Sequence, residues 1–177
     1  MAAFGPDDFS RYDYSLLLNG GVSLFWSRSV WDDGISSLTT LGYRVVRLSA
    51  SRWTNSAEMF RQLAESLDFP DYFGHNFDAL SDCLGDVASG DYGVGPADTG
   101  LALALDDFDA FVDKDQRSAQ TLLDILENQS RHALPFGNRF ICLARSDDPR
   151  LDRRLEPVGA TRVSWTTREF VDRTRGV

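Results

Sequence analysis

The stretch from Phe69 to Gly85 reads FPDYFGHNFDALSDCLG and holds the most specific pattern in the chain. Asn76 is a good N-cap residue and Gly85 is a good residue to end a helix, so the spacing predicts a short helix between them. Leu80 and Leu84 fall on one face of this helix. The stretch is therefore expected to turn an apolar face to a core and a polar face to water.

The polar face of the predicted helix carries Asp78 and Asp82, four residues apart. Like charges at this spacing cost an isolated helix roughly 0.2–0.5 kcal/mol. Asp82 is expected close to the C-terminal end of the helix, where the helix dipole disfavours a negative charge. Such a pair is typical either of a partner-binding surface or of incidental charges on an exposed helix, and spacing alone does not decide between the two.

Apolar periodicity on both sides of this stretch predicts strands that alternate with helices. Strands are expected at 43–48 (YRVVRL), 101–105 (LALAL) and 139–144 (RFICLA), and helices at 57–67 and 116–132. This alternation indicates an α/β fold, with a small parallel β-sheet of three core strands packed with helices and joined by right-handed crossovers.

The flanks are predicted as extensions of a single domain at 1–177, with a core at about 43–144. In the N-terminal extension, 1–42, the sequence favours a hairpin over 16–26 that turns at Asn19-Gly20-Gly21, and a helix over 29–41. In the C-terminal extension, 145–177, it favours an edge strand at 161–165 and a closing helix at 167–174.

The negative charge is concentrated in one part of the chain. The whole chain has a net charge of −9, yet 68–115 contains twelve Asp and one basic residue, Lys114, a net charge of −11. A field of one sign attracts a basic protein and repels nucleic acid, so no nucleic-acid partner is expected. No signal-peptide pattern and no apolar run long enough for a membrane span is present, which predicts a cytoplasmic protein with no membrane partner.

No cofactor or metal site is predicted. Cys83 and Cys142 lie 59 positions apart, and only His75 and His132 could add nitrogen ligands. The two cysteines are therefore expected to be free thiols. The glycines at 90–100 lie among aspartates that would repel a nucleotide phosphate.

The stretch from Pro70 to Leu84 resembles the barstar family, whose pattern is Pro-acid-Tyr-aromatic-Gly-x-Asn-x-Asp-Ala-Leu-x-Asp-Cys-Leu. The matching residues are Pro70, Asp71, Tyr72, Phe73, Gly74, Asn76, Asp78, Ala79, Leu80, Asp82, Cys83 and Leu84. The resemblance extends more loosely over about 43–144. Ser81 stands where the family has a large aromatic residue, His75 stands where an acid is frequent, and the aromatic usual after the helix-ending glycine is absent.

The resemblance implies that the helix and its preceding loop plug the active site of a basic, barnase-like ribonuclease. Asp82 would replace an RNA phosphate, Asp78 would pair with a neighbouring Arg or Lys, and Tyr72 would pack on the rim of the site. The implied partner-binding residues are Tyr72, Gly74, His75, Asn76, Asp78, Ser81, Asp82 and Gly85, with Glu127 from the later helix.

Catalysis by the chain itself is not expected. His75 lies beside two aspartates and Ser81 lies next to Asp82, but neither forms a nucleophile and base pair with an orienting third group. Two functions remain open: a ribonuclease inhibitor, and an interaction module that binds another basic protein without inhibiting a ribonuclease. The free chain is expected to be a monomer.

Overall fold

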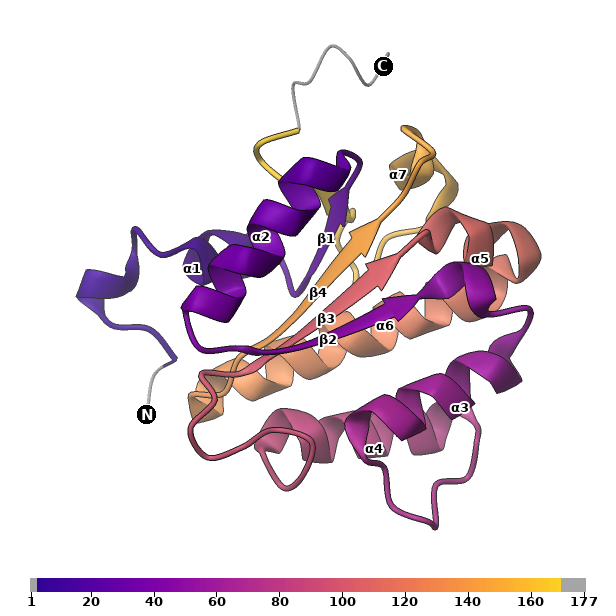
Figure 1. Cartoon of the computed structure of the whole chain (residues 1–177), viewed down its shortest axis with the longest axis horizontal. Helices are drawn as coiled ribbons and strands as arrows, with labels where there is room; N and C mark the ends of the chain where they lie inside the picture. Colours follow the sequence, from indigo (N-terminus) through magenta and orange to yellow (C-terminus); the bar gives the residue numbers. More distant parts are fainter. Residues whose placement is uncertain (1–2, 170–177) are drawn as a thin grey trace.

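The computed structural model describes residues 3–169, and its centre is a five-stranded parallel sheet (Figure 1). The strand order is β2-β3-β4-β1-β5. The strands are β1 (Val22–Phe25), β2 (Arg44–Ser49), β3 (Leu101–Asp106), β4 (Phe140–Arg145) and β5 (Ser164–Trp165). The α/β class is thus confirmed. The three predicted core strands are β2, β3 and β4, and the predicted edge strand in the C-terminal extension is β5.

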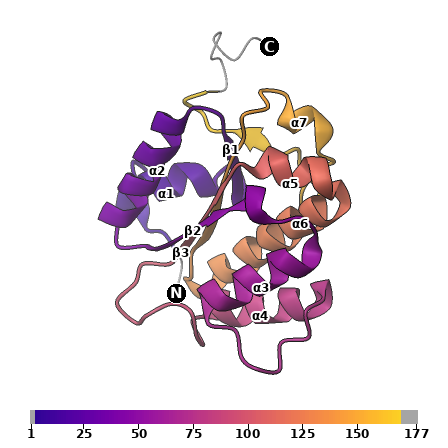
Figure 2. The same cartoon turned by 45° about the vertical axis from the view of Figure 1, so that its right-hand side comes forward.

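Helices cover both faces of the sheet (Figures 1 and 2). One face carries α1 (Tyr12–Leu17) and α2 (Arg28–Thr40), and the other carries α3 (Ser56–Leu67), α4 (Phe77–Ser89) and α6 (Gln116–Ala133). Two short helices, α5 (Phe108–Lys114) and α7 (Leu151–Arg154), lie at the carboxyl ends of the strands. Single 3-10 turns occur at η1 (Pro6–Asp8), η2 (Ala50–Arg52) and η3 (Leu134–Phe136).

The alternation of β3 explains why LALAL is apolar throughout. Its leucines, such as Leu103, join the apolar cluster formed with α3, α4 and α6. Its alanines, such as Ala104, join the second cluster, formed with α1 and α2. Successive side chains of a strand point to opposite faces, so a strand covered on both faces is apolar at every position.

The predicted hairpin at 16–26 is wrong. Tyr12–Leu17 is a helix, and the following strand β1 pairs in parallel with β4 and β5. The glycines have other uses: Gly20 adopts a positive φ of 115°, and a Cβ on Gly21 would lie 2.2 Å from the Cβ of Ser130 in α6. The pair therefore lets the chain leave α1 and pass close to α6.

The helix predicted at 29–41 is confirmed as α2, and its interior glycine has a packing role. A Cβ on Gly34 would lie 2.6 Å from the hydroxyl of Tyr12. The closing helix predicted at 167–174 falls largely outside the described residues.

Buried carboxylates join the N-terminal extension to the core and the C-terminal extension to the N-terminal one. Asp13, in the N-terminal extension, accepts hydrogen bonds from Arg11 and from the hydroxyl of Tyr43 at 2.8 Å. Glu169, in the C-terminal extension, accepts from the backbone N–H groups of Trp26 at 3.0 Å and Ser27 at 2.6 Å. Because a buried carboxylate needs such partners, these contacts hold the extensions in defined positions.

Cys83 and Cys142 are free, as predicted, and both are buried. Burial, and the negative charge of Glu127, raise the pKa of the Cys142 thiol far above its usual range. This thiol is therefore un-ionised at neutral pH.

Candidate functional site

The loop between α3 and α4 is held in place by aromatic packing. The ring of Phe73, 6% exposed, lies 5.0 Å from Phe69 and 6.2 Å from Phe60 of α3, and Phe60 lies 5.0 Å from Phe77 at the start of α4. Tyr72 precedes the buried Phe73 and is 78% exposed. The loop thus presents a tyrosine to solvent from an anchored backbone.

The start of α4 has the predicted cap. The side chain of Asn76 accepts a hydrogen bond from the backbone N–H of Ala79 at 2.8 Å and donates to the carbonyl of Gly74 at 3.3 Å. His75 adopts a left-handed φ of 49°, and its ring lies 4.8 Å from that of Phe73. These contacts fix the position at which the helix begins.

Asp78 and Asp82 are both exposed on α4, as predicted, while Leu80 and Leu84 of the same helix are buried. Within residues 3–169 neither carboxylate has an ion pair or a hydrogen bond. The helix therefore offers two unneutralised charges on a rigid element.

The predicted end of the helix at Gly85 is wrong. The helix continues to Ser89 and ends at Gly90, whose φ is 86°. A Cβ on Gly85 would lie 3.3 Å from the side-chain oxygen of Gln129 in α6, so this glycine permits close helix packing. Asp82 consequently lies in the middle of α4, and the expected unfavourable interaction with the helix C-terminus is absent.

Ser81 lies on the side of α4 that faces α6, and it is partly buried. The side-chain amide of Gln129 donates to the carbonyl of Ser81 at 2.9 Å and to its hydroxyl at 3.1 Å. Ser81 and Gly85 thus help to join the two helices, and they border Asp78 and Asp82 on the side of α4 that faces α6.

Glu127 was predicted on the partner-binding surface, but it is 2% exposed. Its carboxylate accepts from the backbone N–H groups of Gly21 at 2.6 Å and Val22 at 3.0 Å, and from Arg131 at 2.9 Å. Glu127 therefore ties the N-terminal extension to α6 and is not available to a partner in the free protein.

The twelve aspartates of 68–115 separate into two groups in space. The five at the carboxyl end of the sheet all have partners: Asp106 and Asp107 bind Arg145, Asp113 binds Arg154, and Asp109 and Asp115 accept from backbone N–H groups. Of the other seven, Asp68 pairs with Arg44 and Asp98 accepts from the N–H of Gly95.

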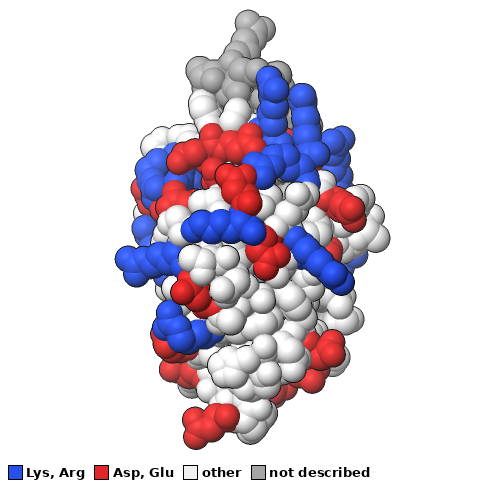
Figure 3. Space-filling model, turned by 90° about the vertical axis from the view of Figure 1, so that its right-hand side faces the viewer, with Lys and Arg blue, Asp and Glu red and all other residues white. Residues whose placement is uncertain are grey.

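The remaining aspartates have no partner in the described part of the chain, and they lie together along the chain at Asp71, Asp78, Asp82, Asp86 and Asp91. All belong to the loop, to α4 or to the residues just after it. Figure 3 shows basic and acidic side chains mixed in its upper part, whereas only acidic ones are seen toward its lower edge. The unpaired aspartates of 68–115 thus lie at the end of the molecule that carries α4. Sequence reasoning missed Asp86, although its i+4 spacing from Asp82 was visible.

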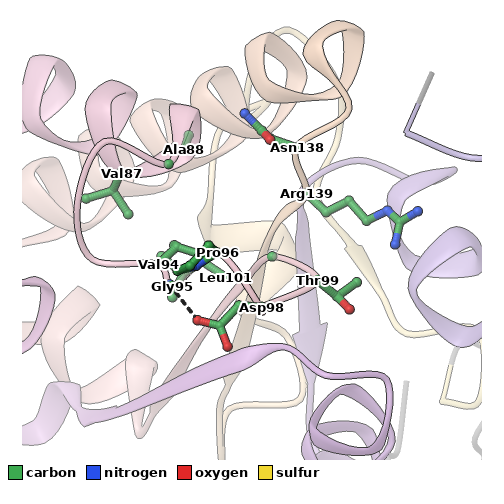
Figure 4. Close-up of a pocket in the computed structure, with 12 residues that line it drawn as sticks. Val87, Ala88, Val94, Gly95, Pro96, Asp98, Thr99, Leu101, Asn138 and Arg139 are labelled. Atoms are coloured by element: carbon green, nitrogen blue, oxygen red, sulfur yellow. Dashed lines mark hydrogen bonds between the residues drawn. The ribbon is translucent and has the colours of Figure 1, made fainter. Parts of the chain in front are cut away.

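A pocket of about 250 Å³ lies between the end of α4, the loop before β3 and the start of β4 (Figure 4). Its polar side chains are engaged in the fold. Thr99 donates to the carbonyl of Leu41 at 2.6 Å, Asn138 donates to that of Ser89 at 3.3 Å, and the guanidinium of Arg139 bonds the carbonyl of Ala3. These groups do not form a nucleophile and base pair that would point to catalysis in the pocket.

The fold and the acidic loop-helix surface define a class of protein: a small α/β domain that presents a rigid, negatively charged helix for contact with another molecule. The family model described as Barstar (barnase inhibitor) matches residues 43–145, which span β2 to β4 and include α4. The chain belongs to the barstar family, a family of inhibitors. No match was found among curated proteins. Within residues 3–169 no helix has both the length and the apolar character needed to cross a membrane.

Proposed function

We propose that the chain binds a basic ribonuclease and occludes its active site, with Asp78 and Asp82 as mimics of RNA phosphates. The observation that carries the proposal is the position of the unpaired aspartates of 68–115, which lie on the loop, on α4 or directly after it. A ribonuclease concentrates positive charge to hold its polyanionic substrate, so carboxylates on a rigid helix are complementary to its active site.

The inhibitory surface would consist of Tyr72, Gly74, His75 and Asn76 from the loop and of Asp78 and Asp82 from the helix. Tyr72 supports this proposal because its exposed ring lies next to an anchored residue and would lose little conformational freedom on binding. The protein would act in the cytoplasm and would have no catalytic activity of its own.

A second function is favoured by two particular contacts. The hydroxyl of Ser81 is already bonded to Gln129 of α6, and Glu127 is buried, so both would offer a ribonuclease less than an exposed, unbonded side chain would. A barstar-like interaction module that binds another basic protein, without inhibiting a ribonuclease, would need only the free aspartates.

An inhibition titration separates the two functions. Secreted basic ribonucleases of the barnase type would be assayed for RNA cleavage with increasing amounts of the chain, in parallel with a direct binding measurement. Stoichiometric loss of cleavage is expected. Binding without loss of cleavage would favour the interaction module, and the absence of both with every ribonuclease tested would contradict the proposed inhibition.

A further inference from the structure

The aspartates of α4 form a row that continues past the two proposed phosphate mimics. Asp86 follows Asp82 by four residues, as Asp82 follows Asp78. Four residues advance a helix by about 6 Å and turn it by about 40° beyond one full turn, so the three carboxylates lie along one side of α4. Asp86 is partly exposed, and its side chain has no ion pair or hydrogen bond within residues 3–169.

The turn of this row carries Asp86 away from the side of α4 that α6 covers. Ser81 marks the covered side, because Gln129 of α6 donates to its carbonyl and to its hydroxyl. At about 100° per residue, Asp86 lies about 140° around the helix from Ser81, whereas Asp82 lies about 100° from it. The row therefore leads toward the side of α4 that α6 does not cover.

Tyr92, from the loop after α4, lies beside the far end of the row. Its hydroxyl donates to the carbonyl of Cys83 at 3.0 Å, and its ring lies 6.2 Å from that of Phe69. Burial, followed by interactions with Cys83, Asp86 and Tyr72, raises the pKa of Tyr92 above its usual range. Asp86 and Tyr72 are thus both close enough to Tyr92 to act on its hydroxyl, which places Asp86 on the side of the molecule that carries the exposed tyrosine of the inhibitory surface.

We propose that Asp86 is a specificity-determining residue of the inhibitory surface, and that the ribonuclease it selects carries a third basic side chain, about one helical turn beyond those that would meet Asp78 and Asp82. The inference rests on the proposed function. A ribonuclease with a basic group at this place would neutralise Asp86 on binding, whereas one without it would remove water from an unpaired carboxylate. Asp86 would therefore separate basic ribonucleases that Asp78 and Asp82 alone bind equally well.

Binding kinetics with a panel of secreted basic ribonucleases of the barnase type test the inference. Asp86→Asn removes the charge of the side chain and keeps its shape. For a ribonuclease with the third basic group, koff should rise at least about tenfold, because the loss of a contact within an interface is expressed mainly in koff. For a ribonuclease without that group, koff should fall below the wild-type value.

Asp7→Asn is the matched control for charge alone. Asp7 is exposed in η1 and has no ion pair within the described residues. Losing one negative charge outside the interface weakens only the steering of the partner, so Asp7→Asn should lower kon by less than about threefold and leave koff unchanged. The melting temperature of Asp86→Asn should not fall, because the substitution removes a like-charge pair with Asp82. A role in the fold alone would lower it.

A double-mutant cycle identifies the third basic group. In a ribonuclease that dissociates faster from Asp86→Asn, replacing one Lys or Arg near its active site with Ala should abolish the effect of Asp86→Asn, and coupling to none of them would overturn the inference. A koff within about twofold of the wild type for every ribonuclease that Asp82→Ala binds more weakly would overturn it and leave the proposed function standing. A wild type that inhibits no ribonuclease of the panel would overturn both.

Discussion

Replacing Asp82 with Ala should make the free protein more stable while it weakens the complex with a ribonuclease. Asp82 lies in the middle of α4, with Asp78 one turn before it and Asp86 one turn after it. Removing two like-charge i,i+4 pairs should contribute about 0.4 to 1 kcal/mol to stability, and the better helix propensity of Ala up to about 0.7 kcal/mol more. A gain of about 1 kcal/mol would raise Tm by about 2–4 °C in a chain of this size.

The effect on binding should have the opposite sign. Truncating one partner of a buried, hydrogen-bonded charge pair costs about 2 to 5 kcal/mol, a range taken from complexes that include this family's own, and this corresponds to roughly 30-fold to several-thousand-fold in affinity. Replacing a residue that the fold needs would lower both the stability of the free protein and its affinity for the ribonuclease. Replacing a residue that only the partner needs should lower the affinity alone.

The assay pairs thermal unfolding with a ribonuclease inhibition titration for the wild type, Asp82→Ala and Asp91→Ala. Asp91 is the matched control, because its carboxylate is exposed, has no partner in the described part of the chain and lies beyond the end of α4. Asp98 is less suitable, since it accepts a hydrogen bond from Gly95 at 2.7 Å. An Asp82→Ala variant that melts several degrees lower, or that binds as well as Asp91→Ala, would refute the phosphate-mimic argument.

Three further outcomes are expected. Glu127→Ala should lose about 2 to 4 kcal/mol of stability, because it leaves two buried N–H groups without an acceptor. Urea unfolding measures this loss of stability, with Asn128→Ala at an exposed position as the control. An equal loss in the two variants would count against the role given to the Glu127 carboxylate. Burial acts to raise the pKa of Asp106, but hydrogen bonds from Arg145 and Arg28 outweigh it and lower that pKa below its usual value. A lowered pKa gives stability that is present above about pH 4 and is lost as pH falls through the folded-state value. Asp106→Asn should therefore flatten the acid side of the curve of unfolding free energy against pH. An unchanged acid side would exclude Asp106 as a source of the acid sensitivity. The association rate with a basic ribonuclease should fall steeply as the Debye length shrinks from about 30 Å at 0.01 M salt to about 10 Å at 0.1 M, and a rate that does not change with salt would indicate an apolar interface.

The strands and helices of the core could be predicted from sequence because each depends on residues that are close together in the chain. The apolar runs of β3 and β4 are continuous, α6 shows clear helical spacing, and the cap of α4 depends on Asn76 and a residue three positions later. The exposure of Asp78 and Asp82 followed from the same periodicity. Each of these features depends on residues within a single helix or strand.

The features that sequence reasoning missed depend on contacts between distant residues. Glu127 accepts from Gly21 and Val22, which are more than 100 positions away. A glycine at position 85 is compatible with a helix end or with close helix packing, and only the approach of Gln129 decides for packing. The hairpin interpretation failed because the local turn signal at Gly20 and Gly21 is the same for a parallel strand that follows a helix.

The fold also decides which aspartates remain free. Arg145 and Arg154, which pair with Asp106, Asp107 and Asp113, come from outside the acidic stretch and lie at the carboxyl end of the sheet. No basic side chain in the described part of the chain pairs with the acids of α4, so Asp78, Asp82 and Asp86 repel one another in the free protein. A positively charged partner would relieve this repulsion when it binds, whereas a neutral one would add the cost of removing water from the carboxylates. The helix therefore favours basic partners through the energy of its own free state as well as through the contacts it would form.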